Sequence, residues 1–204
     1  MPAIKHRLSV RAPNFEALTG LNRDLVFPWQ DFYLAAASLS VSSSPMATCL
    51  AVATLSGSHL SALRFVSTSH GGTTIPVWVT APVPQDAAIS GPASGSGTVY
   101  IDWTDPTTAN AVAVIAASLY LVPNGSTVAD AGTSTLATAC ATLTGTSASE
   151  LQSTSLMSFN APTTRAGFFA LKVGVAAADA ANTSGSNFHL VSARLRYKAD
   201  RIGS

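Results

Sequence analysis

The chain has 204 residues and a formal net charge of +1, and only 10% of its residues are charged although 47% are hydrophobic. Soluble globular chains usually carry about a quarter charged residues, so this protein is unusually poor in charge. That excludes the dense basic face which nucleic-acid binding requires. The longest strongly apolar stretch, around Ala109–Val122, is shorter than the roughly 20 residues that span a bilayer, and we expect no membrane segment.

The low charge has two interpretations that the sequence leaves open. A lone soluble domain normally keeps more charge on its surface, so other subunits are expected to cover part of this one. A genome rich in G and C biases composition in the same direction. The length itself fits one medium domain with terminal extensions better than two domains.

Residues 1–28 are predicted to form an extended N-terminal arm, because they contain Pro2, Pro13 and Pro28 and spaced charges. Ordering a chain costs roughly 1–2 kcal/mol per residue, so such an arm becomes ordered only where it lies on another surface. In an assembly that surface belongs to a neighbouring subunit.

Residues 29–204 are predicted to form an all-β domain, an antiparallel β-sandwich of jelly-roll type with a basic C-terminal end. Short runs of β-branched, aromatic and small apolar residues alternate here with clusters of Gly, Pro, Ser and Asn, which is typical of sandwiches. The expected strands are Asp31–Ala36, Ala47–Thr54, Ser61–Ser67, Ile75–Thr80, Gly97–Trp103, Ala111–Val122, Leu136–Leu143, Leu151–Phe159, Gly167–Ala176 and Phe188–Ala199.

Three of these strands carry more detailed predictions. In Gly97–Trp103, alternation places Val99, Ile101 and Trp103 on one face. In Phe188–Ala199 the apolar phase changes between Leu190 and Leu195, which predicts a β-bulge. The run Ala111–Val122 is continuously apolar and rich in alanine, so periodicity does not separate strand from helix. Its β-branched residues and the following Pro-Asn-Gly turn favour a strand.

Both ends of the chain are basic, whereas the middle is mildly acidic. We expect the basic residues to contact acidic neighbouring subunits; ordinary solvated ends are the alternative. The candidate partner-binding residues are Lys5, Arg7, Arg11, Arg23, Arg194, Arg196, Lys198 and Arg201.

Reactive side chains form no recognisable motif. Cys49 and Cys140 lie in runs of small apolar residues and are expected to be buried free thiols, although the sequence does not say whether they are close together. The histidines are scattered along the sequence. Asp102 and Asp105 are a weak indication of a calcium site, and a capped turn is the simpler interpretation of this pair. We therefore expect no enzyme activity, no metal and no cofactor.

The order of several segments resembles the jelly-roll structural proteins of tailed bacteriophages, which occur as capsid decoration proteins, head spikes or fibres, and tail components. The resemblance covers roughly residues 29–199, with Ala35 where the pattern would place proline. It is carried by Trp29-Gln-Asp-Phe-Tyr-Leu-Ala-Ala-Ala, Leu63-Arg-Phe65, Pro76-Val-Trp78, Gly97-Thr-Val-Tyr-Ile-Asp-Trp103, Ala166-Gly-Phe-Phe-Ala-Leu-Lys-Val173 and Leu190-Val-Ser-Ala-Arg-Leu-Arg-Tyr197.

The resemblance implies a virion protein, assembled in the host cytoplasm, that decorates the capsid and stabilises the phage shell. Its partners would be the major capsid protein or other virion subunits, and it would form a homo-oligomer, by preference a trimer. The alternative is a receptor- or carbohydrate-binding module of a tail tip or fibre. Such a module needs exposed aromatic rings that stack on sugars, and Tyr33, Trp78 and Tyr100 are the candidates.

Overall fold

The computed structural model describes residues 21–34, 50–54, 61–65, 76–89, 97–105, 112–126, 134–145, 150–175 and 188–200. These residues form strands and one short 3₁₀ helix, η1 (Trp29–Asp31), and none of them lies in a helix able to cross a membrane. The strands are β1 (Leu21–Pro28), β2 (Tyr33–Leu34), β3 (Leu50–Thr54), β4 (Ser61–Phe65), β5 (Pro76–Pro82), β6 (Gly97–Thr104), β7 (Val112–Pro123), β8 (Ser134–Thr144), β9 (Gln152–Phe159), β10 (Gly167–Val175) and β11 (Phe188–Ala199).

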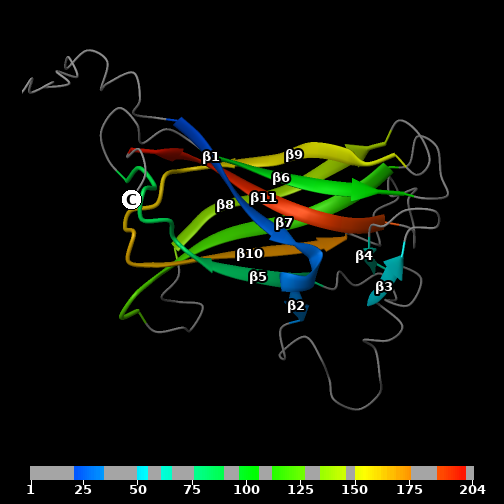
Figure 1. The fold of residues 1–204 in the computed structure, drawn as a ribbon, viewed down its shortest axis with the longest axis horizontal. Coiled ribbons are helices and arrows are strands. Elements are labelled where there is room, and N and C mark those ends of the chain that lie inside the picture. The colour runs from blue at the N-terminus through cyan, green and yellow to red at the C-terminus, as the bar shows by residue number, and fades with distance from the viewer. Residues whose placement is uncertain are drawn as a thin grey trace, which may run out of the picture.

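The strands form two antiparallel sheets that pack face to face as a sandwich (Figure 1). The six-stranded sheet has the order β3-β4-β11-β6-β9, with β1 also paired to β11. The five-stranded sheet has the order β2-β5-β10-β7-β8. The predicted all-β fold with two antiparallel sheets is therefore confirmed.

The core lies between the two sheets and is built from the inward side chains of each strand. Val99, Ile101 and Trp103 of β6 are fully buried, as the alternation predicted. The Trp103 ring stacks on Phe188 with the centroids 5.4 Å apart. Phe159 of the six-stranded sheet meets Phe169 of the five-stranded sheet edge to face at 6.2 Å. Aromatic contacts thus join strands within one layer and also connect the two layers.

All ten expected strands are present, within the described residues, with ends that differ by a few positions. The described part of the apolar run 111–122 lies in strand β7, and the following turn is closed by a hydrogen bond from the Ser126 N–H to the Pro123 carbonyl. Gly125 has φ +82° in this turn, a conformation that glycine adopts at low cost. The predicted change of phase in β11 is a register shift against β6 between Leu190 and Ser192.

Residues 21–28, the last part of the expected arm, form β1 and pair with β11 from Leu21 opposite Ala199 to Pro28 opposite Ser192. The side chain of Phe27 is 3% exposed and belongs to the core. Burial of this side chain and the antiparallel pairing with β11 offset the ordering cost of an extended segment. Residues 1–20 of the expected arm lie outside the described residues.

Cys140 lies on β8 and is exposed, so the expectation that it is buried is wrong. It is followed by Ala141 and preceded by Ala139, both partly buried and packed against the core. Alternation along the strand therefore turns the Cys140 thiol outward. Cys49 lies outside the described residues.

Candidate binding surfaces

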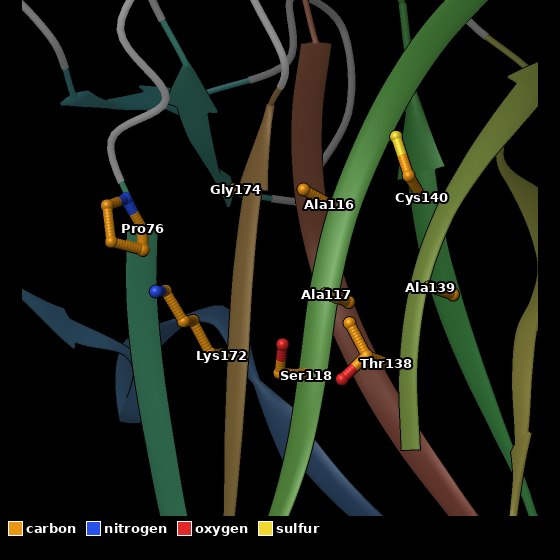
Figure 2. Close-up of a pocket in the computed structure, with 9 residues that line it drawn as sticks. All are labelled: Pro76, Ala116, Ala117, Ser118, Thr138, Ala139, Cys140, Lys172 and Gly174. Atoms are coloured by element: carbon orange, nitrogen blue, oxygen red, sulfur yellow. The ribbon is translucent and has the colours of Figure 1, made fainter. Parts of the chain in front are cut away.

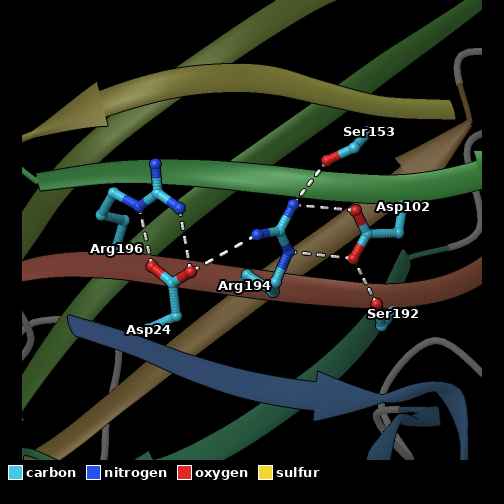
Figure 3. Close-up of polar contacts among 6 residues, drawn as sticks. All are labelled: Asp24, Asp102, Ser153, Ser192, Arg194 and Arg196. Atoms are coloured by element: carbon cyan, nitrogen blue, oxygen red, sulfur yellow. Dashed lines mark hydrogen bonds and ion pairs between the residues drawn. The ribbon is translucent and has the colours of Figure 1, made fainter. Parts of the chain in front are cut away.

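The outer face of the six-stranded sheet carries a connected set of polar side chains, the charge network, made of Asp24, Asp102, Ser153, Ser192, Arg194 and Arg196 (Figure 3). Asp102 points outward from β6 because its neighbours on either side face the core. Arg194 donates to its carboxylate from Nε at 3.0 Å and from Nη2 at 3.1 Å. The Ser192 hydroxyl donates to the same carboxylate at 2.5 Å. This fork geometry is the strong form of an arginine–carboxylate pair.

Asp24 of β1 extends the charge network to a third strand. Arg196 donates to it from Nε at 2.8 Å and from Nη2 at 3.0 Å, and Arg194 lies 3.4 Å away. The two guanidinium groups also lie over the Tyr100 ring, 5.2 Å and 4.9 Å from its centroid. Such cation–π contacts add to the stability of the cluster.

The surroundings of both aspartates favour their ionised form. Hydrogen bonding and the charge of Arg196 hold the pKa of Asp24 below its usual value, against a smaller opposing effect of burial. Burial opposes ionisation of Asp102, but hydrogen bonds from Arg194, Ser192 and Ser153 outweigh it and lower the pKa of that carboxyl. The network is therefore a set of matched charges that satisfy each other.

The predicted partner-binding cations have different surroundings. Arg194 and Arg196 are held in the charge network, and Arg23 forms an ion pair with Asp86 at 2.7 Å. Lys198 on β11 is half-buried and has no ion pair with the described residues. Lys5, Arg7, Arg11 and Arg201 lie outside the described residues. A role of these eight residues in binding another subunit stays a prediction.

The metal-site candidates are not brought together. Asp102 is engaged by Arg194, and Asp105 is buried at the end of β6. His189 is buried on β11, whereas His6, His59 and His70 lie outside the described residues. Among the residues that the structure describes, no three His, Cys, Asp or Glu side chains are grouped as ligands for a metal ion.

The outer face of the five-stranded sheet is different in character, because aromatic rings gather on it. This aromatic face consists of Tyr33, Trp78, Tyr120 and Phe168, with Lys172 beside them. Tyr33 lies opposite Trp78 in the pairing of β2 with β5. The Trp78 and Tyr120 rings have centroids 5.7 Å apart and planes inclined by 25°, which brings them together across the intervening strand β10.

Two of these rings are strongly accessible, since Tyr33 and Phe168 are each 48% exposed. Lys172 places its Nζ 5.5 Å from the centroid of the Trp78 ring. It is the one charged side chain on the outward positions of β5, β10, β7 and β8 within the described ranges. This face thus combines apolar rings with very little charge.

A hollow of about 320 Å³ adjoins the aromatic face (Figure 2). Its floor is made of small residues, Ala116, Ser118 and Gly174, which leave the space unfilled. Pro76 and Lys172 border it from one direction, and β8 borders it from the other. The Ser118 and Thr138 hydroxyls offer hydrogen bonds to a ligand or a partner chain.

Sequence reasoning identified Tyr33 and Trp78 but missed Tyr120 and Phe168, and it grouped Tyr100 with them. Tyr100 lies on the opposite sheet under the two arginines. Strand alternation alone shows which residues share a face of one strand, whereas the strand order decides which strands are neighbours. That order is a long-range property which the sequence pattern does not contain.

No family model and no curated protein matches the chain. Among solved structures, it is similar to a family 35 carbohydrate-binding module from Clostridium thermocellum, with 12% identity, 85% of this chain and 97% of that chain covered, and a TM-score of 0.43. It is also similar to a GH26-CBM35 β-(1,4)-mannanase of Podospora anserina (9% identity, 88% of this chain, TM-score 0.44), of which it spans only 28%. A third similar structure is that of infectious bursal disease virus, strain Gx (12% identity, 91% of this chain and 35% of that chain, TM-score 0.39).

The strand arrangement therefore defines the protein as an all-β antiparallel sandwich of jelly-roll type.

Proposed function

We propose that the protein is a structural subunit of a virus particle, a decoration protein that binds the shell of a tailed bacteriophage and stabilises it. The observation that carries this proposal is the aromatic face, which exposes Tyr33 and Phe168 and carries a single charge among its described positions. Exposed large apolar side chains with little charge around them favour an interaction site, and aromatic residues are enriched at the centre of protein interfaces.

We propose that the shell contacts the aromatic face and not the basic side chains. Three of the basic side chains first considered for this role, Arg23, Arg194 and Arg196, are paired with acids of the same chain. Releasing them to bind another subunit would leave those acids without partners, which costs free energy. The aromatic rings take part in no such ion pairs, so binding another subunit there would leave no acid without its partner. The aromatic face is therefore the better docking surface for the body of the domain.

A receptor- or carbohydrate-binding module is the second candidate function. One observation favours it, since Tyr33 and Trp78 share a face with Tyr120 beside a hollow that is lined with hydroxyl groups. Sugars stack on aromatic rings through their apolar C–H faces while their hydroxyl groups form hydrogen bonds. Both functions use the same surface, and they differ in the partner and in the number of copies per particle.

A charge placed on the aromatic face tests the first proposal. Thr80 is exposed on β5 between Trp78 and Pro82, so Thr80→Glu alters the surface and leaves the core intact. We expect the full-length variant to bind purified particles that lack the protein at least about tenfold more weakly, which corresponds to about 1.4 kcal/mol. The control is Asn22→Glu, which adds the same charge to an exposed position of β1 on the other sheet.

Equal binding of Thr80→Glu and the wild type to the particles would contradict docking through this face. Counting the copies per particle by quantitative mass spectrometry separates the two functions. A number that matches the shell subunits supports decoration. A number that matches the tail, together with glycan binding that is lost in Tyr33→Ala, supports the carbohydrate-binding module instead.

A further inference from the structure

Among the described strands, β8 is the last strand of the five-stranded sheet, and it is paired on one side only. Its 11 residues, Ser134–Thr144, pair with β7, and no strand follows it in the sheet order. Alternate N–H and C=O groups of an antiparallel edge strand point away from its partner. Within the described residues, no backbone hydrogen bond outside this pairing involves residues 134–144. Among the described residues, the outer edge of β8 therefore has backbone donors and acceptors that no other strand pairs with, although β9 of the six-stranded sheet packs near it.

Protein sheets usually protect such an edge with lysine, proline or a very short strand. The sequence of β8, STLATACATLT, contains neither proline nor any charged residue. The edge at the other end of the same sheet is β2, of which two residues, Tyr33–Leu34, are described. A register shift opposite Leu119 and Tyr120 disturbs the beginning of β8. From Ala137 to Thr144 the register is continuous, so this stretch is a regular edge without a charge or a proline to protect it.

We propose that β8 pairs antiparallel with β8 of a second copy of the protein across a two-fold axis, which joins the two five-stranded sheets into one continuous sheet. An identical strand is a suitable occupant, because a two-fold axis brings each residue near an equivalent one and β8 has no charges that would repel. The outward side chains are small or medium in size, with Thr138, Cys140 and Thr142 all exposed. They allow close approach of the second strand.

This pairing fixes the symmetry of the oligomer. A β8-to-β8 contact uses the same surface on both subunits, so it closes as a dimer. The trimer that the resemblance implied would instead need β8 to pair with a different edge. The inference does not depend on the proposed function, because it concerns the edge of the sheet, whereas docking to a shell uses the outer face.

Sedimentation of the full chain over a range of protein concentrations tests the proposal, and a dimer is expected. The variant Thr138→Lys with Thr142→Lys places like charges across the axis at exposed positions that do not contribute to the core. Its dimer should dissociate at least about tenfold more readily, and it should sediment as a monomer where the wild type is dimeric. Thr80→Lys is the control, since it adds one lysine at an exposed position of β5 and should leave the dimer intact.

Cross-linking gives a second readout, because Cys140 lies near the middle of the regular stretch. With Cys49 replaced by serine, a short bis-maleimide should link the two Cys140 thiols of the dimer. A wild type that stays monomeric at every concentration, a trimer, or a dimer that persists in the double lysine variant would each overturn the proposal. A dimer in which the Cys140 thiols do not cross-link would overturn it as well.

Discussion

Replacing Asp102 by asparagine tests how much the charge network stabilises the fold. The carboxylate accepts two hydrogen bonds from Arg194 and one from Ser192. Asparagine has nearly the same shape, but it removes the negative charge and turns an N–H donor toward the donors of Arg194. The substitution therefore changes the electrostatics of the site and leaves its packing almost unaltered.

The contacts of Asp102 set the expected magnitude. Hydrogen bonds to charged groups contribute about 1.5–3 kcal/mol each when the site is buried. The Arg194 and Asp102 side chains are 23% and 15% exposed, so solvent screening reduces the effect. We expect Asp102→Asn to lower the free energy of unfolding by about 2 kcal/mol in total, which corresponds to a decrease in Tm of roughly 4–8 °C for a domain of this size.

The assay is urea unfolding at pH 7 and at acidic pH, followed by tryptophan fluorescence. Because the folded-state pKa of Asp102 is lowered, its contribution is fully present above the unfolded value near 3.8 and is lost as the pH falls through the folded value. The stability gap between wild type and variant should therefore shrink below about pH 4. Asp31→Asn, at an exposed position of η1, is the control. A gap below about 0.5 kcal/mol at pH 7, or one that persists unchanged in acid, would refute this account of the network.

Two further substitutions probe the core and the contact with Asp86. An alanine Cβ at position 97 would lie 2.2 Å from Cζ of Phe159 and 2.6 Å from the backbone oxygen of Arg196. Gly97→Ala should therefore lower the free energy of unfolding in urea by about 1–3 kcal/mol. The decrease should be larger than for Gly125→Ala, where the added Cβ meets no atom within 4 Å and only the positive φ is strained. A Gly97→Ala protein as stable as the wild type would show that the approach of β6 to these residues is looser than described. The Tyr197 hydroxyl donates to Asp86 at 3.0 Å, and burial followed by this hydrogen bond raises the pKa of Tyr197 to about 12. The free energy of unfolding of the wild type should therefore decrease as the pH rises above about 10. Tyr197→Phe should be about 1 kcal/mol less stable at pH 7 and should lose less stability at alkaline pH. The same dependence of stability on alkaline pH in both proteins would argue against this contact.

The strands could be predicted because each has one face in the core, which imposes a period of two on its apolar residues. Gly97–Trp103 shows this most clearly, since every second side chain is fully buried. Strand β1 was missed because Arg23 and Asp24 interrupt its apolar residues. Their partners, Asp86 and Arg196, are far away in the sequence. A local pattern does not show that a charged residue will be neutralised by a distant one.

The candidate surfaces were less predictable than the strands. Tyr33 and Trp78 were named with Tyr100 as candidates for stacking on sugars, but Tyr120 and Phe168 join Tyr33 and Trp78 only through the strand order. Cys140 was assigned to the interior because it lies among alanines and threonines. Such a run contains no large side chain to mark the inward face, so alternation along β8 gives no direction. The charge network was also missed, since it connects strands β1, β6 and β11.

The position of β11 affects how the protein forms during synthesis. This strand pairs with β6 on one side and with β4 and then β1 on the other, so it completes the middle of its sheet although it is the last of the described strands. The strands β1, β4 and β6 leave the ribosome long before the segment that joins them. Domains generally fold as units while translation proceeds, but here the six-stranded sheet has no centre until residue 199 has emerged. The nascent chain must therefore keep the apolar faces of these earlier strands from aggregating until β11 has been translated.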